Sequence, residues 1–166
     1  MPDKETIERA HKDEREGKSP STQAGEFVRE EMHHIREGKH GAASTKQAIA
    51  IGLSKARRAG VKLQVPRKGS AKVKKQASRD YQKGQSQPGE RPSQTRSRAV
   101  SGVLKREGRS AASHRALSRQ ARSTARTRGA AARRQSALKA VRTKGSTVRS
   151  QAAKKAARTR YTRKAA

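Results

Sequence analysis

Apolar residues recur at helical spacing in two neighbouring stretches of the chain. In the first stretch, Val28, Met32 and Ile35 stand at i, i+4 and i+7, and in the second, Ile49 and Leu53 are four residues apart. This spacing places the side chains on one face of an α-helix. The pattern therefore predicts two amphipathic helices, one after the other.

Capping residues and glycines predict the ends of the first helix. Ser19 is suited to the N-cap, because Pro20 then takes the first helical position, which favours proline. Ser21 or Thr22 is an alternative cap. Gly38 follows the last apolar position and predicts the end of the helix.

The second helix has its own end signals. Ser44 and Gln47 match a capping box, in which each side chain binds a free backbone N–H beside the other residue. Gly60 follows the last turn and predicts its end. We therefore expect the second helix to lie between these signals.

Small residues in the second helix predict a close neighbour. Ala48, Gly52 and Ala56 are spaced four residues apart, and a glycine inside a helix costs about 1 kcal/mol relative to alanine. Close approach of another helix would offset that cost. We therefore expect the two helices to pair as an antiparallel hairpin, with Phe27 in the core between them.

Two further elements flank the predicted hairpin. Residues 2–16 predict a charged helix with few apolar anchors, which Gly17 ends. After the hairpin, Val61, Leu63 and Val65 alternate with polar residues. This alternation predicts an extended strap across the small core.

Composition limits the folded part of the chain. Only 30% of the 166 residues are hydrophobic, with one Phe, two Tyr and no Trp. Burial of a large apolar side chain contributes roughly 1.5–3 kcal/mol, whereas ordering each residue costs about 1–2 kcal/mol in backbone entropy. We therefore expect a mainly α fold, with a small helical hairpin module and a largely disordered or conditionally helical basic tail.

Charge divides the chain unevenly. Of the formal net charge of +30, residues 1–63 contribute +3 and residues 64–166 contribute +27. Together with the apolar pattern, this asymmetry predicts four parts. They are a charged N-terminal helix at 1–18, a helical hairpin module at 19–65, a flexible linker at 66–98 and an Arg/Ala-rich tail at 99–166.

The tail contains an internal repeat. The strings ARTRG, VRTKG and ARTRY recur with a period of sixteen residues. Alanine and arginine favour helix, but Gly108, Gly129 and Gly145 are expected to break it into short pieces. Short helices without an apolar stripe are marginal alone in water. We expect fluctuating helix that becomes ordered on a polyanion.

The cations of the tail are candidate nucleic-acid-binding residues. Duplex DNA carries one negative charge per ~1.7 Å of axis, and arginine forms bidentate contacts with phosphate. The candidates are Arg115, Arg119, Arg122, Arg126, Arg128, Arg133, Arg134, Arg142, Lys144, Arg149, Lys154, Lys155, Arg158 and Arg160.

Other kinds of chemistry have little support in the sequence. No nucleophile elbow, paired acid–base motif or P-loop is present, so we expect no catalytic residue, cofactor or enzymatic activity. His33 and His34 are adjacent and point in different directions on a helix, and His40 lies in the predicted turn, with Glu30 and Glu37 nearby. Without cysteine or a histidine pair at i, i+4, we expect surface histidines rather than a metal site.

One block of the sequence resembles a known family. The segments AGEFVREE, HIREGKHGA and STKQAIAIGLSKARRAGV, within residues 19–61, are similar to a family of small uncharacterised bacterial proteins, as is the later LKREGRSAASHRALSRQARSTARTRGAAARR. The resemblance implies a bacterial origin and a compact helical segment followed by a basic tail. It supplies no catalytic residue. The composition of the tail also resembles the lysine/alanine-rich tails of linker-histone-like bacterial proteins.

These observations lead to a functional hypothesis. We expect non-enzymatic, sequence-independent binding of nucleic acid, with DNA favoured over RNA, by a nucleoid-associated or histone-like protein that self-associates through the helical module. No membrane or small-molecule partner is expected, and the N-terminal segment lacks an apolar stretch typical of a secretory signal, so we expect a cytoplasmic location at the nucleoid. The alternatives are an RNA- or ribosome-associated basic protein, a protein-interaction module that the tail only localises, and a hairpin that reads DNA as a helix-turn-helix.

Overall fold

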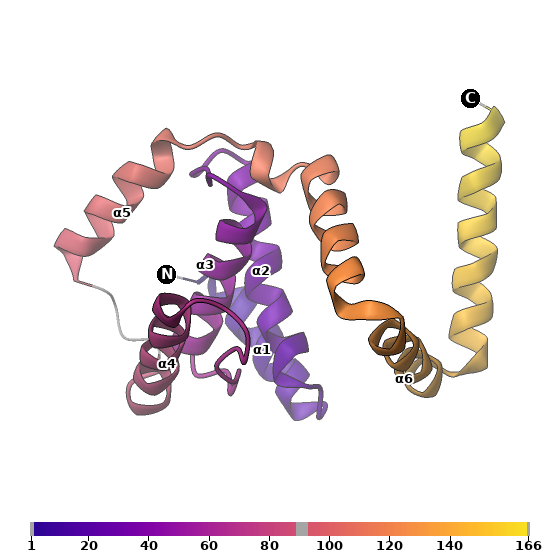
Figure 1. Ribbon diagram of the computed structural model, residues 1–166, viewed down its shortest axis with the longest axis horizontal. Coiled ribbons are helices and arrows are strands. Elements are labelled where there is room, and N and C mark those ends of the chain that lie inside the picture. Colours follow the sequence, from indigo (N-terminus) through magenta and orange to yellow (C-terminus); the bar gives the residue numbers. More distant parts are fainter. Residues whose placement is uncertain (1, 89–92, 166) are drawn as a thin grey trace. The chain divides into compact units, whose positions relative to one another are not determined.

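The chain is mainly α-helical, as expected, in a computed structural model that describes residues 2–88 and 93–165 (Figure 1). The side chains of residues 143–144 and 163–165 lie outside this description. The elements in chain order are α1 (Lys4–Arg15), α2 (Pro20–Arg36), α3 (Thr45–Arg58), α4 (Ala71–Ser86), α5 (Gln94–Arg106), a 3-10 helix η1 (Ser110–Ala112) and α6 (His114–Ala165). The chain divides into two compact units, Met1–Gln120 and Ala121–Ala166.

The first unit is built on the predicted antiparallel hairpin of α2 and α3, which lie side by side in Figure 1. Partners with rising numbers in α2 have falling numbers in α3: Ala24 clusters with Ala56, Val28 lies against Gly52, and Met32 clusters with Ala48. This order of contacts confirms the antiparallel pairing.

Gly52 allows the two helices to approach closely. A Cβ atom built on Gly52 would lie 2.7 Å from the Cα of Val28 and 3.0 Å from the carbonyl oxygen of Phe27. Since real Cβ atoms do not come this close to backbone, a larger residue would force the helices apart. The cost of glycine in α3 is therefore offset by packing, as the small-residue stripe predicted.

The side chains of the hairpin form two apolar clusters. Phe27, at 0% exposure, lies in one cluster with Ala56 of α3 and Ala10 of α1. Ile35, also fully buried, lies in the other cluster with Met32. The predicted core residues Phe27, Met32 and Ile35 are thus confirmed, whereas Ile49 and Leu53 are partly buried at the edges.

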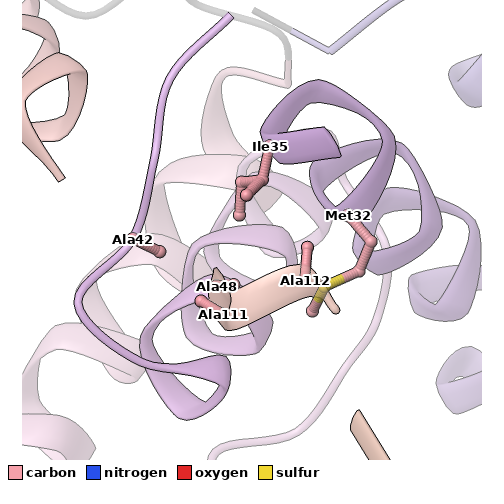
Figure 2. Packing of buried hydrophobic residues seen from close by; sticks show 6 residues of the cluster. All are labelled: Met32, Ile35, Ala42, Ala48, Ala111 and Ala112. Atoms are coloured by element: carbon pink, nitrogen blue, oxygen red, sulfur yellow. The ribbon is translucent and has the colours of Figure 1, made fainter. Parts of the chain in front are cut away.

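A segment from the predicted tail completes the second cluster. Figure 2 shows Ala111 and Ala112 of η1 among Met32, Ile35, Ala42 and Ala48 of the hairpin and its loop. The Thr45 hydroxyl donates to the Ala111 carbonyl at 2.7 Å, and Arg36 Nε donates to the Ala112 carbonyl at 2.9 Å. The structure therefore differs from the prediction that this segment belongs to the tail. Hydrogen bonds to its backbone, together with the burial of two alanines, hold it on the hairpin.

The loop between α2 and α3 also binds this segment through its backbone. The Gly41 N–H donates to the Leu104 carbonyl at 2.8 Å, and the Ala42 N–H donates to the Gly108 carbonyl at 3.1 Å. A side chain at Gly41 would collide with the carbonyl of Glu107. Position 41 of the loop therefore requires glycine, because the backbone of the loop contacts the backbone of Glu107 there.

The predicted N-terminal helix is present as α1 and packs against α2. Ala10 is buried, and Arg9 Nε forms an ion pair with Glu26 Oε2 at 2.8 Å. Before α1, Asp3 lies 3.1 Å from Nε2 of His34 on α2. That hydrogen bond lowers the pKa of the Asp3 carboxyl below its ordinary value, so the side chain is ionised at neutral pH.

α4 lies in the segment that composition predicts to be a flexible linker. It packs on α3, where the Ser54 hydroxyl donates to Asp80 Oδ2 at 2.7 Å. Asp80 and Ala77 are buried, and a side chain at Gly84 would collide with the Arg57 carbonyl. Two contacts thus hold α4 on α3: the close approach of Gly84 to the backbone of Arg57, and the hydrogen bond of the buried Asp80 carboxylate. The hydrophobic pattern of the sequence indicates neither contact.

Arg57 joins α3 to the predicted strap. Its guanidinium is buried and donates to the carbonyls of Leu63 and Gln64, each at 3.2 Å. Burial lowers the pKa of Arg57, and the negative charge of Asp80 partly opposes this effect. Val61 is buried against the Phe27 cluster, so the extended strap lies where the alternation of residues predicted.

The capping residues make a testable pair. The Ser44 hydroxyl accepts from the Gln47 N–H at 3.2 Å, whereas Ser19 caps α2 without a side-chain bond to its backbone N–H groups. Ser44→Ala should lower the free energy of unfolding of the first unit by about 1 kcal/mol. Ser19→Ala, the matched control, should change it far less. Amide hydrogen exchange in α2 and α3 of the full chain measures both, and equal losses would show that the Ser44 bond contributes nothing specific.

Candidate nucleic-acid interface

The basic tail is helical and is divided by two glycines. Within α6, Gly129 (φ 73°) and Gly145 (φ 65°) leave the helical conformation, so the helix consists of segments 114–128, 130–144 and 146–165. The predicted breaks at these glycines are confirmed. Gly108 likewise lies between α5 and η1. That the free tail fluctuates stays a prediction.

The breaks follow the sixteen-residue repeat. Gly129 and Gly145 occupy the same position of consecutive repeats, and Tyr161 occupies that position in the third. A positive φ favours glycine over residues with a Cβ atom. Accordingly the helix continues through Tyr161. In the first two repeats, the glycine thus ends one helical segment, and in the third, which lacks it, the helix continues.

Two equivalent arginines follow the breaks. Arg133 and Arg149 each stand four residues after a glycine. Arg133 Nη1 donates to the Ala125 carbonyl across the first break at 3.0 Å, and Arg149 Nε donates to the Gly145 carbonyl at 3.0 Å. A guanidinium has five N–H donors. Most donors of each side chain are therefore left for another acceptor.

The predicted contact residues are displayed on the surface. The candidates Arg115, Arg119, Arg122, Arg126, Arg128, Arg133, Arg134, Arg142, Arg149, Lys154, Lys155, Arg158 and Arg160 are all exposed. The side chain of Lys144 lies outside the described residues. Exposure is the condition that contact with phosphate requires.

The first helical segment collects its arginines on one face. Spacings of four, three and four residues place side chains within a narrow arc of a helix. Four arginines have these spacings: Arg115, Arg119, Arg122 and Arg126. We call this row the arginine stripe. Its members are candidates from composition and charge, and the spacing of the arginines in the sequence is the signal that also indicates their shared face.

The positively charged tail contains almost no acidic residues of its own. Residues 108–166 contain neither Asp nor Glu. The first helices differ, because cations there pair with acids: Lys18 Nζ lies 2.6 Å from Asp13 Oδ1, and Arg9 pairs with Glu26. The positive charge of the tail is therefore not neutralised by acids of its own sequence, whereas the surface formed by α1 and α2 is more nearly balanced.

Comparisons with known proteins bear on the folded part. Residues 15–69 match a family of unknown function, DUF6496. This agrees with the resemblance noted from the sequence at the level of an uncharacterised family, and the match ends before the tail. No curated protein and no solved structure matched the chain. In the described part of the chain, no helix has the length and apolarity needed to cross a membrane.

Proposed function

We propose that the chain binds duplex DNA through phosphate contacts of its tail, without catalysis and without sequence preference. The observation that carries the proposal is the row of exposed cations on the segments of α6, in a stretch without acidic residues. A role at the bacterial nucleoid follows from this activity and from the sequence resemblance.

The dimensions of the segments suit a polyanion. A helix rises 1.5 Å per residue, so a segment of the size of residues 114–128 is about 22 Å long. Duplex DNA presents about 13 charges over that length. Each phosphate neutralised by arginine or lysine releases counterions, and this release drives binding. Arginine adds bidentate hydrogen bonds to phosphate oxygens.

The glycine breaks favour contact with phosphates rather than base reading. A Cβ atom built at Gly129 or Gly145 would meet no described atom within 4 Å, and a hydrogen bond from Arg133 to the Ala125 carbonyl crosses the first break. Base reading requires a helix held in a fixed position in the groove. Segments joined by glycines without tight packing can instead follow the backbone of any duplex.

The arginine stripe provides the test of this proposal. In the full chain, Arg115→Gln, Arg119→Gln, Arg122→Gln and Arg126→Gln together should weaken binding to unrelated duplexes by a similar factor. The slope of log affinity against log salt should become shallower by up to about 3.6, since each phosphate contact contributes about 0.9. Fluorescence anisotropy with several duplexes at three or more salt concentrations measures both quantities.

Lysine at the same four positions is the matched control. It keeps the charge and loses only the bidentate contacts, so the salt slope should stay close to that of the natural chain. An unchanged slope in the glutamine variant would contradict the proposed contacts. Tight binding to one duplex alone would favour the helix-turn-helix alternative, and selective binding of RNA in a parallel titration would favour the ribosome-associated alternative.

A further inference from the structure

The first unit contains a buried cluster of acids and histidines that DNA binding does not use. It gathers side chains from the N-terminus, from α2, from the loop after α2 and from α3. The members are Asp3, Glu30, Glu31, His34, His40 and Lys55. We call it the His–Glu cluster.

Glu31 is the most deeply buried member. Its side chain is 0% exposed, and within the described part of the chain neither carboxylate oxygen accepts a hydrogen bond of acceptable geometry. Ionic partners are nevertheless close: Lys55 Nζ lies 2.6 Å from Oε2, and His40 Nε2 lies 3.3 Å from Oε1. The burial of the Glu31 carboxylate is therefore offset by nearby positive charge rather than by well-directed hydrogen bonds.

His40 lies beside Glu31. Its Nδ1 lies 3.0 Å from the Gly41 carbonyl oxygen, which can only accept, so Nδ1 carries a hydrogen. In the neutral imidazole, Nε2 is then an acceptor, and it lies 3.3 Å from Glu31 Oε1 without the alignment of a hydrogen bond. Two acceptor atoms this close favour a cation beside them.

His34 has the corresponding arrangement on α2. Its Nε2 lies 3.1 Å from Oδ2 of the Asp3 carboxylate, and its Nδ1 lies 3.8 Å from Glu30 Oε1. With the hydrogen on Nε2, the neutral ring leaves Nδ1 as an acceptor on the side of Glu30. Metal-bound histidines commonly have such an oxygen partner on the outer ring nitrogen. In each ring, one nitrogen thus has an oxygen partner and the other is available as a ligand atom.

The charges of the cluster also favour a cation. Lys55 lies within ion-pair distance of two buried carboxylates, those of Glu30 and Glu31, whereas Asp3 pairs with His34 and is influenced by Lys39 at longer range. While both rings are neutral, one ammonium group therefore serves two buried carboxylates. A divalent cation would supply the missing charge without protonating either histidine.

We propose that Glu31, His34 and His40 bind a divalent transition-metal ion of the zinc type. One ligand atom from each of these residues lies within 4.8 Å of the others. Imidazole nitrogens favour Zn²⁺ over Mg²⁺ and Ca²⁺, which prefer oxygen ligands. Two histidines and one glutamate form a known zinc ligand set, in which water takes the fourth position.

The ion has a route into the site. A cavity of about 460 Å³ opens beside the cluster and is lined by Asp3, Glu30 and His34, among others. Its volume accommodates water and a hydrated ion. Its wall has no net charge, because it carries as many basic as acidic side chains: Lys4, Arg9, Arg29 and Lys39 against Asp3, Glu5, Glu30 and Glu37. Zn²⁺ would draw Glu31 away from Lys55, so binding competes with that ion pair.

The test uses the full chain, freed of metal and without nucleic acid. Titration with Zn²⁺ by calorimetry should give one tight equivalent, and Mg²⁺ should give none. His40→Ala should weaken Zn²⁺ binding about 100-fold or more, because loss even of an outer partner of a ligand costs 10–100-fold. His11→Ala is the matched control, since His11 is exposed on α1 and belongs to no such cluster in the described residues; it should bind as the natural chain does.

The absorption spectrum of bound Co²⁺ tests the site in the natural chain, without a substitution. Co²⁺ in the site should show the visible absorption bands of a tetrahedral ion with nitrogen ligands, and Zn²⁺ should abolish them. Glu31→Gln, a second variant of similar shape, should weaken binding as His40→Ala does. Absence of these bands in the folded natural chain, or equal affinities of the natural chain and His40→Ala, would overturn the proposal.

Discussion

Replacing Phe27 with alanine should lower the free energy of unfolding of the first unit by about 3–5 kcal/mol. Phe27 is the one phenylalanine of the chain, is fully buried, and joins α1, α2 and α3 in one cluster. Its removal leaves a cavity that small neighbours such as Ala10 and Ala56 cannot fill. In a unit with so few large apolar side chains, this loss is expected to approach the whole stability.

Amide hydrogen exchange of the full chain measures the effect. Protection in α1, α2 and α3 should fall together in Phe27→Ala, because one cluster joins them. Val103→Ala is the control, since Val103 is exposed on α5, and it should leave that protection unchanged. A loss confined to α1 would show that α2 and α3 depend mainly on the Met32 and Ile35 cluster.

Lys55→Met should also destabilise the first unit strongly, by about 3–5 kcal/mol in metal-free buffer. The substitution keeps the aliphatic part of the side chain and removes the charge that lies 2.6 Å from Glu31. A buried carboxylate then has no lysine partner, which is costly. The loss should be near the lower end of the range, because the Lys55 side chain is 22% exposed.

A second substitution separates this electrostatic cost from lost packing. In Lys55→Met combined with Glu31→Leu, both charges are gone, and much of the stability should return. Lys46→Met is the control, because Lys46 is exposed on the same helix and should have little effect. If the double variant is no more stable than Lys55→Met, the ion pair is not the cause of the loss.

The α2–α3 hairpin could be predicted from the sequence because its signals are local. The spacing of Val28, Met32 and Ile35 set the buried face, and Gly38 and Gly60 set the helix ends. The capping box was correct in its main bond, although Gln47 reaches the N–H of Ala43 rather than that of Ser44. Local patterns of this kind require no knowledge of distant contacts.

The packing of α4 and of the segment around η1 could not be predicted in this way, because contacts between backbones hold these two segments. Gly84 on α4 touches the Arg57 carbonyl, and Gly41 touches the Glu107 carbonyl. Neither glycine belongs to an apolar pattern. Ala111 and Ala112 are buried, but two alanines are a weak signal in a chain rich in alanine. Composition alone therefore predicts a linker and a tail for these segments.

The His–Glu cluster could not be predicted from residue spacing either, for another reason. His34 and His40 come together only because the loop after α2 reverses the chain, and their ring centroids are 6.3 Å apart. His33, the neighbour in sequence, is exposed and is absent from the cluster. A three-residue-longer loop with the same composition would keep every local signal and lose the site.

The glycine-ended segments of α6 have a consequence for how this protein changes over evolutionary time. Gly129 and Gly145 stand at equivalent points of the repeat, and the space around both is open. An in-frame duplication or deletion of sixteen codons would therefore add or remove one complete segment, with its cations and its end signal, and leave the neighbouring segments intact. If the tail binds DNA as proposed, each such step changes the number of phosphate contacts by those of one segment and leaves the sequence of the hairpin unchanged.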